Sequence, residues 1–203
     1  MKKIMLAVAF SFVVAVAASQ ENTTISNHSF GVKAGLNLAN LHYKSGDNTE
    51  NGDLKAGLHA GVFARVALTQ SLTFQPELLF SMEGTKDTED DETIKWNNNY
   101  IQLPLMLQFG TPSGFYAEIG PSFGYLLSAK LKSEYLGEEE ELDIKDESEK
   151  INIAGNIGVG YALPNGFGAG VRYMHGFSNL YKDDTDDEKV RTRGFQISIF
   201  KRF

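Results

Sequence analysis

Cysteine is absent from this 203-residue sequence, which excludes a disulfide framework and a lipid-modified N-terminal cysteine. The fold must therefore be held together by backbone pairing and side-chain packing. The sequence also lacks clustered lysine and arginine, and its formal net charge is −7. Binding to nucleic acid requires concentrated positive charge against the phosphates, so we expect no nucleic-acid partner.

The N-terminus carries an uncharged hydrophobic run at residues 4–18, preceded by two lysines. A basic start, an apolar stretch and small residues at its end are typical of a cleaved signal peptide. The run has only about 15 residues, whereas a membrane-spanning helix needs roughly 20. We therefore predict a signal peptide at residues 1–19, a periplasmic segment at 20–29 and one folded domain at 30–203.

Negative charge is concentrated in a few windows. Of the 26 Asp and Glu residues, all except Glu21, Glu77 and Glu118 lie in residues 42–53, 83–95, 130–150 and 178–191. Between these windows the sequence alternates with period two over segments of ten or more residues, longer than the usual strands of soluble proteins. Glycine is frequent, and no segment after residue 19 has a convincing helical repeat.

The alternating segments predict eight strands. They are residues 30–41, 54–68, 72–82, 94–109, 115–131, 151–163, 167–177 and 190–203. Their connections alternate in length, because 69–71, 110–114 and 164–166 are tight turns whereas the other four are the long acidic windows. Outer-membrane barrels have short periplasmic turns, longer extracellular loops and an even number of strands.

Each predicted strand has one apolar face and one mixed face. The apolar face includes Leu58, Val62, Leu105, Ile157 and Ile197. The mixed face combines glycine, serine and amides with a few charges, which suits the crowded interior of a narrow barrel better than the exterior of a soluble one. A soluble barrel of lipocalin type, with its apolar face turned inward around a ligand, is the alternative architecture.

The aromatic residues favour the membrane architecture. On the apolar face they gather beside the short turns and toward the long loops, as two membrane interfaces would select. The last strand alternates up to Phe203 and resembles the C-terminal signature of outer-membrane barrels, although Lys201 departs from that signature. We therefore predict an all-β, eight-stranded antiparallel up-and-down transmembrane β-barrel in the outer membrane. Its strand edges must close on one another, because unpaired backbone groups are costly in hydrocarbon.

Four segments together resemble a known family. They are GVKAGLNLANL (31–41), LTFQPELLFSMEG (72–84), YIQLPLMLQFG (100–110) and YAEIGPSFGYLLSAK (116–130). In order and spacing they resemble the PorT-like outer-membrane β-barrel family of the Bacteroidetes. The resemblance covers nearly the whole chain after the leader and implies a barrel of about eight strands. It implies no catalytic residues, and the secretion role of the family's namesake belongs to particular members.

Charged residues on the mixed face are the candidate site. The predicted internal charge network consists of Lys33, Arg65, Glu77, Glu118 and Arg172. By parity His59, Gln75, Gln102 and Gln108 lie near it. Buried charges are expected to pair and to complete their hydrogen bonds, so we interpret the network as a rigid filling of the bore. A gated polar path for ions or small solutes is the alternative.

Other chemistry has little support in the sequence. The acidic runs lack the spacing of known calcium loops, and we predict neither a metal nor a cofactor. His59 or His175 with Ser122 or Ser128 is conceivable as a hydrolytic pair, but no nucleophile motif surrounds either serine, and we predict no enzymatic activity.

The sequence thus predicts a small envelope protein with a structural or interaction role. Its expected partners are the lipid of the outer membrane and extracellular or envelope proteins that contact its acidic loops, and we expect a monomer. Two alternatives remain open from the sequence: a narrow channel or accessory factor for transport or secretion across the outer membrane, and a soluble lipocalin-like ligand-binding barrel.

Overall fold

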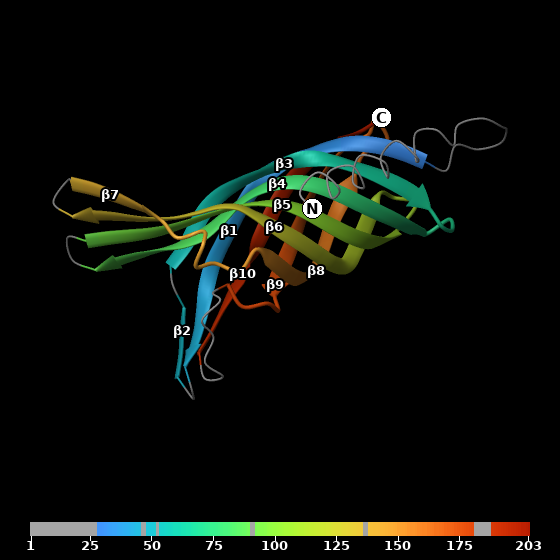
Figure 1. The fold of residues 1–203 in the computed structure, drawn as a ribbon. Helices are drawn as coiled ribbons and strands as arrows, with labels where there is room; N and C mark the ends of the chain where they lie inside the picture. Colours follow the sequence, from blue (N-terminus) through green and yellow to red (C-terminus); the bar gives the residue numbers. More distant parts are fainter. Residues whose placement is uncertain (1–27, 46–47, 52, 90–91, 136–137, 181–187) are drawn as a thin grey trace.

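The computed structural model describes residues 28–45, 48–51, 53–89, 92–135, 138–180 and 188–203. Within these ranges, no helix has the length and apolar composition needed to cross a membrane. The described residues form antiparallel strands (Figure 1). The strands are β1 (His28–Ser45), β2 (Asn48–Asn51), β3 (Asp53–Ala67), β4 (Leu72–Glu89), β5 (Glu92–Gly110), β6 (Phe115–Tyr135), β7 (Glu138–Asp143), β8 (Ile151–Ala162), β9 (Phe167–Gly176) and β10 (Glu188–Arg202).

Eight of these strands close into a barrel in the order β1, β3, β4, β5, β6, β8, β9 and β10. The last strand pairs with the first along a continuous ladder from Gly31 opposite Arg202 to Ser45 opposite Glu188. This closure leaves no open sheet edge between the first and last strands, as the hydrocarbon region of a membrane requires. The predicted eight-stranded antiparallel up-and-down barrel is confirmed.

Five strands of the wall, β1, β4, β5, β6 and β10, continue further outward than the sequence boundaries suggested. The β4 and β5 ladder runs continuously from Leu79 opposite Gln102 to Glu89 opposite Glu92, through the acidic window that the sequence predicts to be a loop. The outer end of β6 pairs with β7 in the same way, and β2 pairs with the outer end of β1. Figure 1 shows the β4–β5 and β6–β7 hairpins projecting beyond the barrel wall. The hydrogen bonds of a ladder join backbone groups, so a segment rich in acidic side chains can still extend a hairpin.

The connections at the opposite end are tight, as predicted. Two of them contain a glycine with positive φ, which is 99° at Gly114 and 89° at Gly166. The amide of Gly166 donates to the carbonyl of Leu163 at 3.0 Å, which closes the turn between β8 and β9. A side chain at Gly166 would place its Cβ 2.6 Å from the carbonyl oxygen of Arg202, so this position requires glycine both for space and for conformation.

The two faces of the strands are as the alternation predicted. Ile157, Val62 and Ile199 expose 58%, 48% and 70% of their surface on the outside of the barrel. The inward positions are buried, including every polar member of the mixed face near the middle of the bore. A wide exposed apolar girdle on a closed barrel is the arrangement that lipid requires.

Large apolar side chains also fill the interior, which the sequence analysis did not anticipate. Phe63, Leu79, Met106, Met174 and Phe200 are buried at inward positions among the polar groups. At the long-loop end a hydrophobic cluster adds to this filling. It consists of Tyr100, Leu126, Ala129 and Ile144, with Trp96 and Leu131 packed against it.

Candidate functional site

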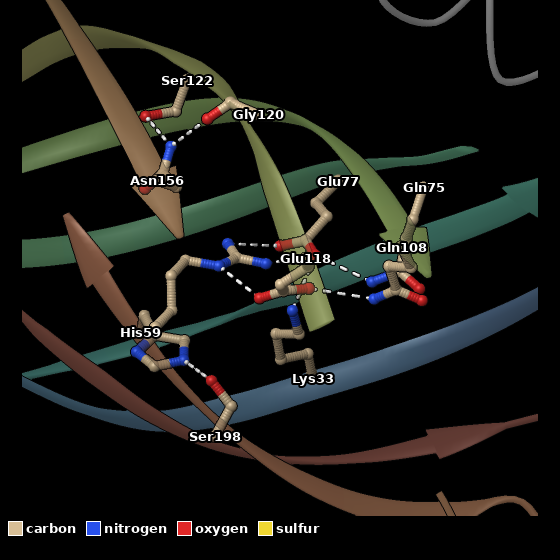
Figure 2. A network of polar contacts seen from close by, with 11 residues as sticks. Lys33, His59, Gln75, Glu77, Gln108, Glu118, Gly120, Ser122, Asn156 and Ser198 are labelled. Carbon is tan, nitrogen blue, oxygen red and sulfur yellow. Dashed lines mark hydrogen bonds and ion pairs between the residues drawn. The ribbon is translucent and has the colours of Figure 1, made fainter. Parts of the chain in front are cut away.

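Four charged side chains meet in the middle of the bore from four different strands (Figure 2). Lys33 Nζ of β1 lies 2.7 Å from Glu77 Oε1 of β4. The guanidinium of Arg172 on β9 binds both carboxylates, with Nη2 2.8 Å from Glu77 Oε1 and Nε 2.8 Å from Glu118 Oε1 of β6. We call these four residues the bore network. Its two positive and two negative charges balance, so the barrel buries no net charge there.

Two amides complete the hydrogen bonds of the carboxylates. Gln75 Nε2 donates to Glu77 Oε1 at 2.9 Å, and Gln108 Nε2 donates to Glu118 Oε2 at 3.0 Å. Together with a 3.1 Å bond from Arg172 Nη1 to Glu77 Oε2, these give all four carboxylate oxygens a donor. Charges withdrawn from water are tolerated when they are paired and hydrogen-bonded in this way.

Gly158 makes room for one of the ion pairs. On β8 it lies opposite both Glu118 and Arg172, so the pair forms across it. A Cβ at this position would lie 3.0 Å from Glu118 Oε1. The small residue therefore lets the glutamate and the arginine reach each other over an intervening strand.

Arg65 does not join the bore network, contrary to its place in the predicted set. Its Nη2 lies 3.5 Å from Thr73 Oγ1, and the structure gives it no ion pair among the described residues. Lys33 pairs across β1 and β3 with Gly61, so Arg65 lies four residues, or roughly 13 Å, nearer the short turns. Parity placed Arg65 on the correct face but did not determine its height in the bore.

His59 binds a serine that the sequence analysis did not consider. Its Nε2 lies 2.9 Å from Ser198 Oγ and its Nδ1 lies 2.8 Å from Asn37 Oδ1. Because the Asn37 oxygen can only accept, Nδ1 carries the ring proton and Nε2 accepts from the serine. Ser122, in contrast, accepts a hydrogen bond from Asn156 at 3.0 Å. His59 is 2% exposed, so this chain of hydrogen bonds belongs to the packed interior.

A buried glutamate lies closer to the long-loop end. Glu83 is 3% exposed and accepts hydrogen bonds from Ser81 at 3.0 Å and from Gln102 at 2.5 Å. From the sequence, Glu83 belongs to an acidic loop window and Gln102 lies near the predicted network. Glu83 has the same inward parity as Glu77 and Ser81, and this parity could have identified it as a buried residue.

A cavity of about 330 Å³ lies at the short-turn end of the bore. Its walls include Arg65, Arg202, Gln108, Phe63, Tyr116 and Phe200, and residues of the turns at 110–115 and 162–164 form its rim. Gln75 and Gln108 line this cavity and also donate to the bore network, so the network forms its inner boundary.

The projecting hairpins carry ion pairs of their own. Lys95 lies 3.1 Å from Glu134, and Lys132 lies 3.0 Å from Glu141, which also binds Lys130. Hydrogen bonds from Lys130 and Lys132 hold the pKa of Glu141 below its ordinary value. In the part of the chain that the structure describes, no group of three or more His, Asp or Glu side chains is placed to hold a metal ion.

Comparison with known proteins gives a family match over most of the chain. The model of the family described as outer membrane protein beta-barrel domain matches residues 18–182. No curated protein sequence matches. Among solved structures, the chain is similar to the attachment invasion locus protein Ail of Yersinia pestis, with 16% identity over 87% of this chain and 99% of that chain and a TM-score of 0.46.

Two further solved structures are similar to this chain to a comparable degree. Neisserial surface protein A is 18% identical over 86% of this chain and 97% of its own, with a TM-score of 0.48. The outer membrane protein OprG of Pseudomonas aeruginosa is 14% identical over 86% of this chain and 95% of its own, with a TM-score of 0.40.

The family match and the exposed apolar girdle overturn the soluble lipocalin-like alternative, which needed the apolar face inside the barrel. The chain belongs to the outer membrane protein beta-barrel domain family and is a small β-barrel protein of the outer membrane.

Proposed function

We propose that this protein is a closed, non-enzymatic barrel that anchors acidic hairpins at the cell surface and serves a structural or interaction role in the envelope. The bore network carries this proposal. Arg172 reaches across the bore to carboxylates on two other strands, and Lys33 reaches one of them, so charged side chains occupy the centre of the barrel. The apolar cluster at the long-loop end adds a second obstruction.

The hairpins are the surfaces that this role would use. The β6–β7 pair places Glu141 and neighbouring carboxylates beyond the wall, held in register by a ladder from Lys130 opposite Asp143 to Tyr135 opposite Glu138. An ordered acidic strand presents charge in a fixed geometry, which supports contact with a basic partner in the extracellular space or envelope better than a solvated loop does.

A narrow channel, or an accessory factor for transport or secretion, is the second candidate function. The cavity at the short-turn end favours it, because Gln75 and Gln108 continue its polar lining up to the bore network. To connect this cavity with the outer half of the bore, the ion pairs of the bore network would have to rearrange and the apolar cluster at the long-loop end would have to move. Eight strands nevertheless leave little lumen once side chains are in place.

Planar-bilayer recording separates the two functions. We expect the refolded barrel to give no discrete conductance steps, whereas a water-filled porin inserted by the same procedure serves as the positive control for incorporation. Regular unitary openings of the wild-type barrel would refute the closed barrel and establish the channel.

We further propose that residues 1–19 are a signal peptide, that the segment predicted at 20–29 is periplasmic up to His28, where β1 begins, and that the mature monomer belongs to the PorT-like branch of the Bacteroidetes barrels. The basic and apolar leader and the order of the four motifs support this. N-terminal sequencing of the protein from outer-membrane fractions should start at residue 19 or 20. A start at Met1 would contradict the cleaved leader.

A further inference from the structure

The cavity at the short-turn end contains two arginines and no acid. Arg65 on β3 lies opposite Ser29 of β1, and Arg202 on β10 lies opposite Gly31 of the same strand. The two side chains therefore enter the bore from either side of β1, two residues apart in height. All residues that line this cavity belong to the described part of the chain, and none of them is Asp or Glu.

Among the described residues, neither arginine has a strong partner. Arg65 Nη2 lies 3.5 Å from Thr73 Oγ1, and Arg202 Nη2 lies 3.3 Å from the carbonyl oxygen of Leu163. Both acceptors are neutral and both contacts are long. Arg172, in contrast, makes three bonds of 2.8 to 3.1 Å to carboxylates. The carboxylates nearest in the bore are already saturated by the bore network, so two positive charges remain available in a concave site.

One wall of the cavity is aromatic, because Phe63 and Phe200 lie two residues from Arg65 and Arg202 on the same strands and on the same inward face. The rings of Phe63 and Phe200 meet edge to face with centroids 6.0 Å apart, and Tyr116 packs against Phe200 at 6.3 Å. Gly31 makes this wall possible, because a Cβ there would lie 2.1 Å from the ring of Phe63. At the rim, the hydroxyls of Thr111 and Ser113 are 2.9 Å apart and supply further polar atoms.

We propose that this cavity binds a small organic oxyanion, a phosphate monoester or a carboxylate with a compact apolar substituent. The guanidinium groups of Arg65 and Arg202 hold the charged end, since their planar donors match both oxyanions. The aromatic wall packs the substituent. A volume of about 330 Å³ is sufficient for a molecule of this size. In a barrel of this family the short turns face the periplasm, so the ligand enters from that side.

Calorimetric titration of the refolded barrel in non-ionic detergent tests this proposal. The probes are phenyl phosphate, benzoate and inorganic phosphate. We expect saturable 1:1 binding of phenyl phosphate, tighter than that of inorganic phosphate because only the former contacts the aromatic wall. Arg65→Gln and Arg202→Gln should each weaken binding about tenfold, the usual size of a lost charged hydrogen bond. Lys201→Gln is the matched control, because Lys201 lies over the outward ring of Phe167 at 4.4 Å and should leave binding unchanged.

The same titrations distinguish a phosphate ligand from a carboxylate ligand, and parallel stability measurements test whether the variants fold. Binding of phenyl phosphate without benzoate assigns a phosphate ligand, and tighter binding of benzoate than of phenyl phosphate assigns a carboxylate ligand. The arginine variants should remain heat-modifiable and should resist urea as well as wild type, because removing one of two like charges relieves repulsion. Absence of saturable binding by all three probes, or equal binding by wild type and the doubly substituted Arg65→Gln, Arg202→Gln barrel, would overturn the proposal.

Discussion

Glu77→Gln is expected to lower the free energy of unfolding by about 3 to 5 kcal/mol, the cost of removing one partner from a buried ion pair. Glu77 receives hydrogen bonds from Lys33, Gln75 and Arg172 and is 2% exposed. The amide keeps the shape of the side chain but leaves one positive charge in excess in the bore. Urea unfolding of the barrel in lipid vesicles, followed by the loss of the folded band on gels, measures the change.

Two further variants test whether the loss of stability comes from the unbalanced buried charge rather than from replacing any glutamate of an ion pair. Glu134→Gln removes an exposed pair with Lys95 at 3.1 Å and should cost about 0 to 1 kcal/mol. Lys33→Met combined with Glu77→Gln restores neutrality in the bore and should recover part of the loss. A Glu77→Gln barrel as stable as wild type would show that the bore network does not stabilise the fold. A combined variant less stable than Glu77→Gln alone would show that the loss does not come from the unbalanced charge.

Ile157→Arg is expected to destabilise the barrel by about 2 to 4 kcal/mol, because it places a charge at the depth of the bilayer centre. Ile157 lies near the middle of β8, opposite Ile119 on one side and Tyr173 on the other, with 58% of its surface exposed outward. The same urea titration in vesicles measures the cost. Labels attached at this position should contact acyl chains.

Leu163→Arg is the matched control for depth. Leu163 also faces outward, with 42% of its surface exposed, but it lies in the short turn after β8 at the membrane boundary. An arginine there should cost only about 0 to 1 kcal/mol, since its side chain can reach the headgroups. Equal costs at the two positions would mean that the apolar girdle does not face a bilayer.

The sequence by itself determined the number of barrel strands, their antiparallel order and their faces, but not the additional strands β2 and β7. These three properties follow from local features: alternation assigns each side chain to a face, and turn length distinguishes the two ends. Ile157 and Glu118 could therefore be placed outside and inside the barrel without any long-range information. The long-loop boundaries were the exception, because the acidic windows concealed strand continuations such as β4 to Glu89.

Only the tertiary structure decided which inward residues meet. Parity says nothing about height in the bore, which depends on the register between strands and therefore on residues far apart in the chain. Register brings Glu77 and Arg172 together, pairs His59 with Ser198 and places Arg65 with Arg202 at the other end of the bore. Alternation with period two predicts whether a charged side chain points into or out of the barrel. It does not predict the height of that side chain in the bore, and the sites of this protein depend on that height.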